Sequence, residues 1–252
     1  MIRIVTLDLF HTLVQPMPTR EDRLAAVCRD LGMAREPDDF LLASVAADDY
    51  FTSENGRWPI HTRSREEQVA FYAGFYGMFL RAVGLMDDPD SRERVRSGME
   101  ARRGDWVIHD DAYDAIDALR DRDLALAIIS NTPVDARPLC DRVDLTRRVD
   151  FIVSSCLVGC EKPCPEIFHA ALEEARVPPD EALHVGDQPL SDSVGAVAVG
   201  MATLLLDRRG ALDHVTKYKR IASLGEIAPW IDAKRQAPLE LPAERGTRSI
   251  VP

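Results

Sequence analysis

Polar side chains of the types that bind phosphate and hard cations occur in four short, widely separated segments of the chain. They comprise three carboxylates, a lysine, two hydroxyls and an amide: Asp8, Thr12, Ser130, Asn131, Lys162, Asp187 and Asp192. Carboxylate oxygens suit Mg²⁺, whereas lysine and polar hydrogen-bond donors bind phosphate oxygens. A divalent cation would also remove the repulsion between an aspartate nucleophile and an anionic substrate. These residue types therefore predict a combined site for a phosphate and a divalent cation.

Apolar runs rich in β-branched residues predict the elements that position these side chains. We expect buried strands at 3–10, 124–130, 151–154, 183–186 and 202–206. Helical periodicity between them predicts helices at 111–119, 165–175 and 191–199. Strands that alternate with helices form a parallel sheet covered on both faces. The sequence therefore predicts an α/β fold with a Rossmann-like parallel sheet in three layers, α/β/α.

The polar residues fall where such a sheet binds its ligands, beyond the carboxyl ends of its strands. Asp8 lies near the end of the first predicted strand, Ser130 ends the second, and Asp187 follows the fourth directly. Lys162 lies between the third strand and the helix expected from Pro165. Each residue alone could be an ordinary polar residue at a strand end. Their joint arrival at one edge of the sheet favours a functional site.

The interval 16–105 interrupts this alternation. It contains no convincing buried strand but has helical patterns at 20–31, 38–50, 66–83 and 91–101. We therefore predict a core domain of residues 1–15 and 106–230, with an all-helical domain of residues 16–105 inserted after the first strand. Residues 231–252 are rich in Pro, Ala, Glu and Arg and offer little to bury, which predicts a disordered C-terminal tail.

Composition and charge exclude two classes of partner. A formal net charge of −11 leaves no excess positive charge for a nucleic-acid backbone. The apolar stretch near the N-terminus is interrupted by Asp8 and is too short for a signal peptide or a membrane span. We therefore expect a cytoplasmic protein that acts on a small molecule and binds neither nucleic acid nor membranes.

The five cysteines do not predict a disulfide framework, because their number is odd and their spacing is uneven. Cys156, Cys160 and Cys164 recur every four residues. A structural zinc site normally uses pairs spaced by two residues together with a fourth ligand. We therefore expect isolated thiols at these three positions.

Five aromatic residues recur at helical spacing in the longest helix predicted within the insert. They are Phe71, Tyr72, Phe75, Tyr76 and Phe79. This pattern is typical of the core of the insert or of a dimer face. The sequence therefore leaves a monomer and a homodimer open.

Four ordered motifs resemble those of the haloacid dehalogenase superfamily. They are DLFHTL at 8–13, ISNT at 129–132, Lys162-Pro163 before PEIF, and HVGDQPLSD at 184–192. Each piece is short, but the ordered set spans the whole predicted core and is specific. The resemblance implies a hydrolase that takes phosphate from a small phosphorylated metabolite. It also implies that the helical insert is the mobile cap found in many members.

The resemblance implies how the nucleophile and the metal are arranged. Asp8 would attack phosphorus in line and form an aspartyl-phosphate. Mg²⁺ would be held by the carboxylates of Asp8 and Asp187 and by the backbone carbonyl of Phe10. Asp192, also assigned to the metal site, would most naturally orient Lys162 or a water bound to the metal.

The resemblance also assigns the residues that meet the phosphate. Ser130, Asn131 and Lys162 would contact the phosphoryl oxygens, and Lys162 would in addition neutralise Asp8. Thr12 would brace the loop or donate a hydrogen bond to the phosphate.

One position departs from the phosphatase pattern. Most phosphatases of this family carry a second aspartate two residues after the nucleophile, where it protonates the leaving group and then activates water. Phe10 occupies that position here. The aromatic residue resembles the true 2-haloacid dehalogenases, whose halide leaving group needs no proton. Asp187 and Asp192, however, keep the metal-binding pattern that those dehalogenases lack, which favours the phosphatase.

The departure at Phe10 leaves two questions open. His11 is the neighbouring group with a suitable pKa to act as acid and base, unless it only caps the loop. A third hypothesis is a phosphate-binding homologue that has lost turnover together with the second aspartate. The retention of Asp8, which a binding protein does not need as a nucleophile, favours an enzyme.

Overall fold

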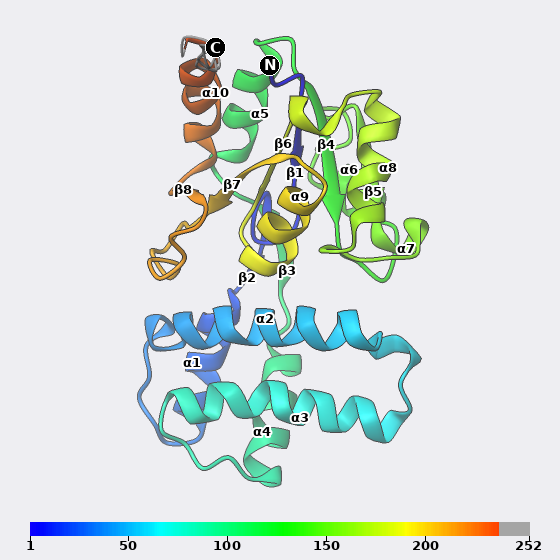
Figure 1. Cartoon of the computed structure of the whole chain (residues 1–252). Coiled ribbons are helices and arrows are strands. Elements are labelled where there is room, and N and C mark those ends of the chain that lie inside the picture. Colours follow the sequence, from blue (N-terminus) through cyan, green and yellow to red (C-terminus); the bar gives the residue numbers. More distant parts are fainter. Residues whose placement is uncertain (237–252) are drawn as a thin grey trace, which may run out of the picture.

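The computed structural model describes residues 1–236, and its centre is a six-stranded parallel sheet (Figure 1). In spatial order the strands are β5 (Phe151–Ser154), β4 (Ala125–Ser130), β1 (Ile4–Leu7), β6 (Ala182–Gly186), β7 (Ala202–Leu206) and β8 (Lys219–Ile221). The chain runs outward from β1 to β4 and β5 and then returns to the other side of β1 at β6. The strand order therefore reverses at β1, and open α/β sheets bind ligands at the carboxyl ends of such a switch point.

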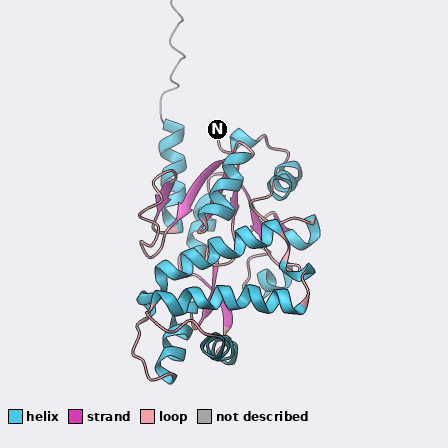
Figure 2. Cartoon of the chain, turned by 60° about the horizontal axis from the view of Figure 1, so that its bottom comes forward, coloured by secondary structure: helices cyan, strands magenta, loops and turns pink. Residues whose placement is uncertain are grey.

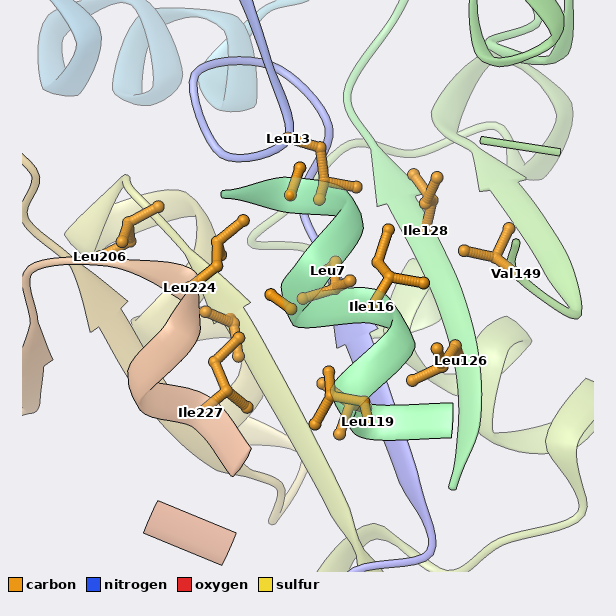
Figure 3. Close-up of a cluster of buried hydrophobic side chains, with 14 of the residues drawn as sticks. Leu7, Leu13, Ile116, Leu119, Leu126, Ile128, Val149, Leu206, Leu224 and Ile227 are labelled. Atoms are coloured by element: carbon orange, nitrogen blue, oxygen red, sulfur yellow. The ribbon is translucent and has the colours of Figure 1, made fainter. Parts of the chain in front are cut away.

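Helices cover both faces of the sheet. They are α5 (Ala112–Arg120), α6 (Arg137–Arg142), α7 (Ser155–Val158), α8 (Pro165–Ala175), α9 (Gly195–Ala198) and α10 (Ile227–Gln236). In β1, Val5 and Leu7 belong to a hydrophobic cluster with α5 and α10 (Figure 3), and Ile4 belongs to a second cluster with α8 and α9. Each fully buried Leu or Ile contributes about 1.5–3 kcal/mol. The sheet edge that carries the polar residues is thus held by apolar packing on both sides.

Four further helices form a separate group, which we call the helical unit. They are α1 (Arg20–Asp30), α2 (Leu41–Arg57), α3 (Arg65–Ala82) and α4 (Pro89–Ala101). They pack around their own hydrophobic cluster, which includes Leu24, Phe40 and Phe79. Thr19 and Ser64 begin α1 and α3 with capping boxes, so the local sequence fixes where both helices start. Figure 1 shows the helical unit beyond one end of the sheet, with α2 nearest to it, and Figure 2 shows the molecule with this end turned forward.

A short two-stranded link joins the helical unit to the sheet. β2 (Val14–Met17) pairs antiparallel with β3 (Asp105–Ile108). Two hydrogen bonds also tie α2 to the loops that follow β6 and β5: Thr52 Oγ1 lies 3.4 Å from Gln188 Oε1, and Asn55 donates to Glu161. The helical unit therefore lies against the sheet edge where the predicted site residues meet.

The predicted fold class is confirmed, and several predicted boundaries need correction. The first strand ends at Leu7 and not at residue 10, because the chain turns there with Leu13 N bonded to Leu9 O. The helix predicted at 191–199 is a π-helix, Pro189–Val194, followed by α9. The β2–β3 link lies where the sequence indicated no strand. The division into a core and an inserted domain stays a prediction.

The predicted start of the C-terminal tail, residue 231, lies too early in the chain. α10 continues to Gln236, and Ile231 is fully buried against the sheet, because its face completes the apolar cover of β7 and β8. The rest of the predicted tail, residues 237–252, lies outside the described residues. Within residues 1–236, no helix is both long and apolar enough to cross a membrane.

Candidate active site

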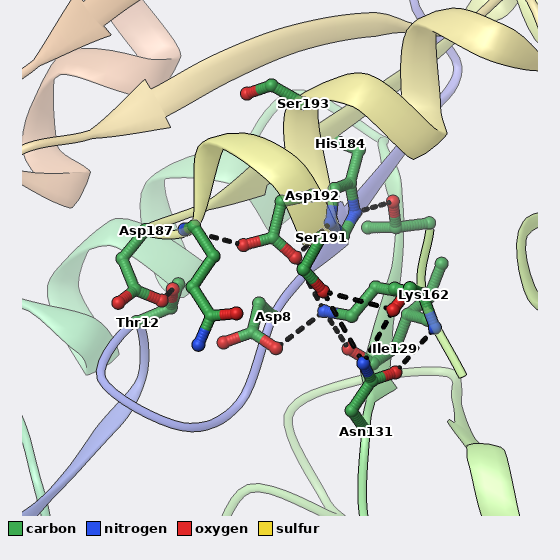
Figure 4. Close-up of polar contacts among 12 residues, drawn as sticks. Asp8, Thr12, Ile129, Asn131, Lys162, His184, Asp187, Ser191, Asp192 and Ser193 are labelled. Atoms are coloured by element: carbon green, nitrogen blue, oxygen red, sulfur yellow. Dashed lines mark hydrogen bonds and ion pairs between the residues drawn. The ribbon is translucent and has the colours of Figure 1, made fainter. Parts of the chain in front are cut away.

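Three neighbouring strands carry predicted site residues at their carboxyl ends (Figure 4). Asp8 is the first residue after β1, Asp187 is the first after β6, and Ser130 is the last of β4. β1 pairs in parallel with both β4 and β6, so the three strand ends lie next to one another. The sheet topology alone therefore brings these side chains to one edge.

Lys162 lies at the centre of the polar network, with only 2% of the residue exposed. Its Nζ donates to Asp8 Oδ1 (2.6 Å), to Asp192 Oδ1 (2.7 Å) and to the carbonyl of Ile129 (3.0 Å). These three bonds use every N–H of the ammonium group. Burial opposes the charge, but the two carboxylates raise the pKa of Lys162 above its ordinary value. Lys162 therefore remains a cation between two anions.

Asn131 holds the backbone of Lys162 in place. Its side-chain oxygen accepts from the Lys162 N–H (2.7 Å), and its amide nitrogen donates to the Lys162 carbonyl (2.9 Å). The amide also lies 3.4 Å from Ser191 Oγ. The side chain of Asn131 is thus engaged in positioning Lys162, and its predicted contact with a phosphoryl oxygen stays a prediction.

Asp192 is held by donors on several sides. Gln188 N donates to Oδ2 (2.9 Å), and His184 Nε2 lies 3.2 Å from Oδ1. Burial lowers the pKa of His184, so the ring is neutral and donates its one N–H to Asp192, while Nδ1 accepts from Thr6 Oγ1 at 2.8 Å. Burial opposes the charge of Asp192 as well, but Lys162 and His184 keep its pKa below the ordinary value. Asp192 therefore stays ionised and orients Lys162.

His184 was not among the predicted site residues. It is a polar residue in the middle of a strand that is otherwise apolar and completely buried, and this was the available signal. Two local features then bring Asp192 back onto the strand end. The π-helix Pro189–Val194 carries Asp192, and a Cβ atom at Gly186 would lie only 2.2 Å from Asp192 Cγ. The glycine is therefore required for this close approach.

Three carboxylates converge beside Lys162. Asp8, Asp187 and Asp192 each offer one oxygen, and these oxygens lie within 4.8 Å of one another. Burial, followed by the charges of Asp8 and Asp192, raises the pKa of Asp187 well above its ordinary value. Burial also raises the pKa of Asp8 to about 6, although Lys162 acts in the opposite direction. A single ammonium group does not compensate three carboxylates, and a divalent cation would.

Two hydroxyl groups complete the sheet edge. Thr12 Oγ1 donates to Asp187 Oδ1 at 3.3 Å, so Thr12 braces a carboxylate of the acidic cluster. Ser130 Oγ is buried and has no hydrogen-bond partner among residues 1–236. Buried hydroxyls are rarely left unsatisfied in native structures, because an unmade hydrogen bond costs about 1–3 kcal/mol. The hydroxyl of Ser130 is therefore a candidate to bind an oxygen atom of a ligand.

Phe10 and His11 both pack against Trp106. The rings of Phe10 and Trp106 have centroids 4.5 Å apart, and those of His11 and Trp106 are 5.7 Å apart. Phe10 therefore serves packing, and its side chain provides no acid. The backbone of His11 is left-handed (φ 64°), which directs its side chain differently from a residue in a continuing strand. Burial, with a smaller effect of Arg20, lowers the pKa of His11.

A cavity of ≈ 370 Å³ lies between the sheet edge and the helical unit. Asp187 and His11 line it from the sheet, and Arg20, Ser44 and Asp48 line it from the helical unit. A substrate whose reacting group meets Asp187 would therefore extend toward α1 and α2.

Comparisons with known proteins bear on the family and the fold of the chain. Residues 2–200 match the family described as haloacid dehalogenase-like hydrolase. Haloacid dehalogenase-like hydrolase domain-containing protein 3 of Mus musculus is 36% identical over 132 residues, which are 50% of this chain and 53% of that protein. The chain thus spans about half the length of the curated relatives of this kind.

A longer match is phosphoserine phosphatase of Thermus thermophilus, 27% identical over 82% of this chain and 89% of that protein. Among solved structures, the putative hydrolase YfnB of Bacillus subtilis, bound to magnesium, has a TM-score of 0.57 at 19% identity and covers 92% of this chain and 99% of its own. A 2-haloacid dehalogenase of Pseudomonas syringae has a TM-score of 0.54 at 23% identity, covering 93% and 100%. The two structural matches support the fold alone.

Proposed function

Because the chain belongs to the haloacid dehalogenase-like hydrolase family, we propose that it is a Mg²⁺-dependent phosphatase of a small metabolite. The observation that carries the proposal is the acidic cluster beside Lys162. Three carboxylate oxygens lie within 4.8 Å of one another, and one of them belongs to Asp8, which Lys162 contacts at 2.6 Å. The carboxylates of Asp8 and Asp187 in this cluster fit a hard divalent cation, which would offset the burial and the carboxylate repulsion that raise the pKa of Asp187.

In this proposal Asp8 and Asp187, with the backbone carbonyl of Phe10, would hold Mg²⁺. When bound, Mg²⁺ would supply positive charge that offsets the charge of the phosphoryl group. Asp192 does not serve as a direct ligand, because Lys162, His184 and the backbone N–H of Gln188 already use its oxygens.

Each residue of the site has its own role in the proposed phosphoryl transfer. Lys162 fixes Oδ1 of Asp8, which leaves Oδ2 as the atom that attacks phosphorus. The phosphorus–ester oxygen bond breaks, the alcohol leaves, and the phosphoryl group stays on Asp8 until water hydrolyses it. The unpaired hydroxyl of Ser130 binds a phosphoryl oxygen, and Asn131 keeps Lys162 in place.

The leaving alkoxide still needs a proton, which the Phe10 side chain does not supply. We assign the proton transfer to His11, which lines the cavity beside Asp187. In the first step protonated His11 gives its proton to the leaving alkoxide, and its lowered pKa makes it a stronger donor. The neutral ring then accepts a proton from the attacking water in the second step and returns to its protonated form.

The helical unit acts in this proposal as the cap that selects the substrate. Its polar residues line the cavity opposite Asp187. Phosphatase names among the relatives, such as the phosphoserine phosphatase of Thermus thermophilus, support a small phosphorylated substrate.

Phe10 favours one rival activity, the dehalogenation of a 2-haloacid. In that reaction Asp8 would displace halide from carbon, and no proton donor would be needed for the leaving group. The acidic cluster argues against it, because two additional carboxylates near Asp8 would repel an anionic substrate unless a cation is present.

The test is phosphate release from a mixed panel of sugar, nucleotide, amino-acid and cofactor phosphates in the presence of Mg²⁺. We expect release to stop with EDTA and to fall by at least about 1,000-fold in Asp8→Asn, while the exposed Asp180→Asn variant keeps full activity. His11→Gln should slow esters of poor leaving groups more than esters of good ones.

Two outcomes would replace the proposal. Activity that survives EDTA, with halide released from 2-haloacids, would establish the dehalogenase. Binding of beryllium fluoride without turnover of any ester would establish a phosphate-binding protein.

A further inference from the structure

Two cysteines and a glutamate come together beside the turn that carries Lys162. Cys160, Cys164 and Glu166 each offer one ligand atom, and these atoms lie within 4.8 Å of one another. Cys164 Sγ lies 2.6 Å from Glu166 Oε2. The spacing alone predicted isolated thiols. Cys160 and Cys164 are free thiols, and the structure brings them close together. Cys156, although it shares the spacing, is exposed and lies outside this cluster.

Backbone geometry at both ends of the segment explains why these side chains converge. Gly159 ends α7 in a left-handed conformation (φ 89°), which redirects the chain just before Cys160. The backbone N–H of Cys164 then donates to the Glu161 carbonyl at 2.9 Å, which closes a tight turn. Glu166 follows in the first turn of α8. The turn after α7 and the start of α8 thus bring the two thiols and the carboxylate together.

We propose that Cys160, Cys164 and Glu166 form a binding site for a thiophilic divalent cation of the zinc class. Zinc accepts sulfur and carboxylate ligands together, and four-coordinate sites with three protein ligands keep one position for water. On binding, each thiol loses its proton to solvent and forms a sulfur–metal bond, so the cation replaces the proton that Cys164 shares with Glu166. The oxygen-only acidic cluster, by contrast, suits a hard cation such as Mg²⁺.

The geometry around Cys164 favours a cation. Its Sγ lies 2.6 Å from a carboxylate oxygen of Glu166, so a soft and a hard ligand atom lie side by side. A cation bound there would take the place of the thiol proton.

The site has a consequence for its neighbour in the chain. Lys162 lies between the two cysteines, and its Nζ contacts Asp8 at 2.6 Å. An ion that bridges Cys160 and Cys164 would clamp the turn on both sides of Lys162. The zinc-class site would therefore stabilise the loop that the proposed phosphatase activity needs, although binding itself does not depend on that activity.

The test is a titration of the full chain with Cd²⁺, whose bond to thiolate gives an ultraviolet absorption band that carboxylate ligands do not produce. We expect a saturable band that Zn²⁺ removes by competition and Mg²⁺ does not. Cys160→Ser and Cys164→Ser should each weaken binding by at least about 100-fold, and Glu166→Gln by about 10-fold. Cys156→Ser is the matched control and should bind as the unmodified chain does.

The outcomes are separable from those of the phosphatase proposal. Asp8→Asn should bind Cd²⁺ with unchanged affinity, because the band reports sulfur ligands only. A band that forms in Cys160→Ser with the affinity of the unmodified chain, or that disappears in Cys156→Ser, would overturn the assignment. So would a chain that binds no Cd²⁺, including one in which Cys160 and Cys164 form a disulfide on mild oxidation.

Discussion

Two polar clusters meet at the cavity, one of them through Asp187, and they differ in how their charges are compensated. The sheet-edge cluster consists of Asp8, Lys162, Asp187 and Asp192, with one cation for three carboxylates. The bridging cluster consists of Arg20, Glu21, Ser44 and Asp48 from the helical unit and Arg209 from the loop after β7, with two cations for two carboxylates.

The bridging cluster is internally satisfied. Arg20 makes a two-pronged contact with Asp48, with both N–O distances at 2.7 Å. Glu21 accepts from Ser44 and lies 3.4 Å from Arg209. Burial alone would raise the pKa of Glu21, but Arg20 and the Ser44 hydroxyl hold it below its ordinary value. The folded state thus favours the charged forms of these residues, as in a structural ion pair.

In the sheet-edge cluster the pKa values of the carboxylates shift in the opposite direction. The pKa values of Asp8 and Asp187 are both raised, so the fold disfavours their charged forms. Raised carboxylate pKa values at a cavity mark sites that are organised for a ligand. The two clusters therefore differ in charge balance. The carboxylates of the sheet-edge cluster are not fully compensated within the protein and would be neutralised by the proposed cation, whereas those of the bridging cluster are compensated by arginines.

The largest expected effect comes from removing the central cation. Lys162→Met leaves Asp8 and Asp192 buried without their cationic partner and should reduce the free energy of unfolding by about 3–5 kcal/mol. Arg209→Met is the control in the bridging cluster, where the side chain is 39% exposed, and it should cost at most about 1 kcal/mol. Denaturant unfolding of both variants measures the contrast, and equal losses would contradict it.

An intermediate effect is expected from neutralising one carboxylate in each cluster. In EDTA, Asp187→Asn should stabilise the protein by at least about 1 kcal/mol, because two like charges 4 Å apart repel by about that amount even in water. Asp48→Asn should instead destabilise it by about 1–3 kcal/mol, since it deprives the buried guanidinium of Arg20 of its partner. Two variants that shift the melting temperature in the same direction would refute the distinction.

The smallest effect is a difference in pH dependence. Glu21 has a lowered pKa, so the stability it provides is present above its unfolded pKa and is lost as pH falls through the folded value. Asp187 has a raised pKa, so its destabilising charge disappears as pH falls through that higher value.

Stability measured against pH in EDTA therefore distinguishes the two residues. Glu21→Gln should be less stable than the unmodified chain by about 1 kcal/mol at neutral pH, and this deficit should shrink on acidification. The advantage of Asp187→Asn should also shrink on acidification, but at a higher pH. If the loss of stability in Glu21→Gln grew as pH falls, the pKa of Glu21 would not be lowered in the folded protein.

Local signals in the sequence determined the fold class and the residues at the ends of the strands. Apolar β-branched runs predicted five of the six sheet strands, because burial on both faces leaves a readable pattern. β8, a strand of three residues with an exposed Lys219, carries no such pattern. Once the sheet was predicted, Asp8, Ser130 and Asp187 could be placed at one edge, since parallel strands end on the same side.

Only the tertiary structure decided which side chains meet across the chain. The bond between His184 and Asp192 depends on the π-helix and on the missing Cβ of Gly186. The approach of Cys160 to Cys164 depends on the left-handed backbone at Gly159. The pairing of Arg20 with Asp48 depends on how α1 and α2 lie within the helical unit. Periodicity records which face of an element is buried, whereas the direction of a side chain after a turn depends on a few dihedral angles and on neighbours distant in the chain. For that reason the sequence determined the list of candidate residues, and the fold determined their partners.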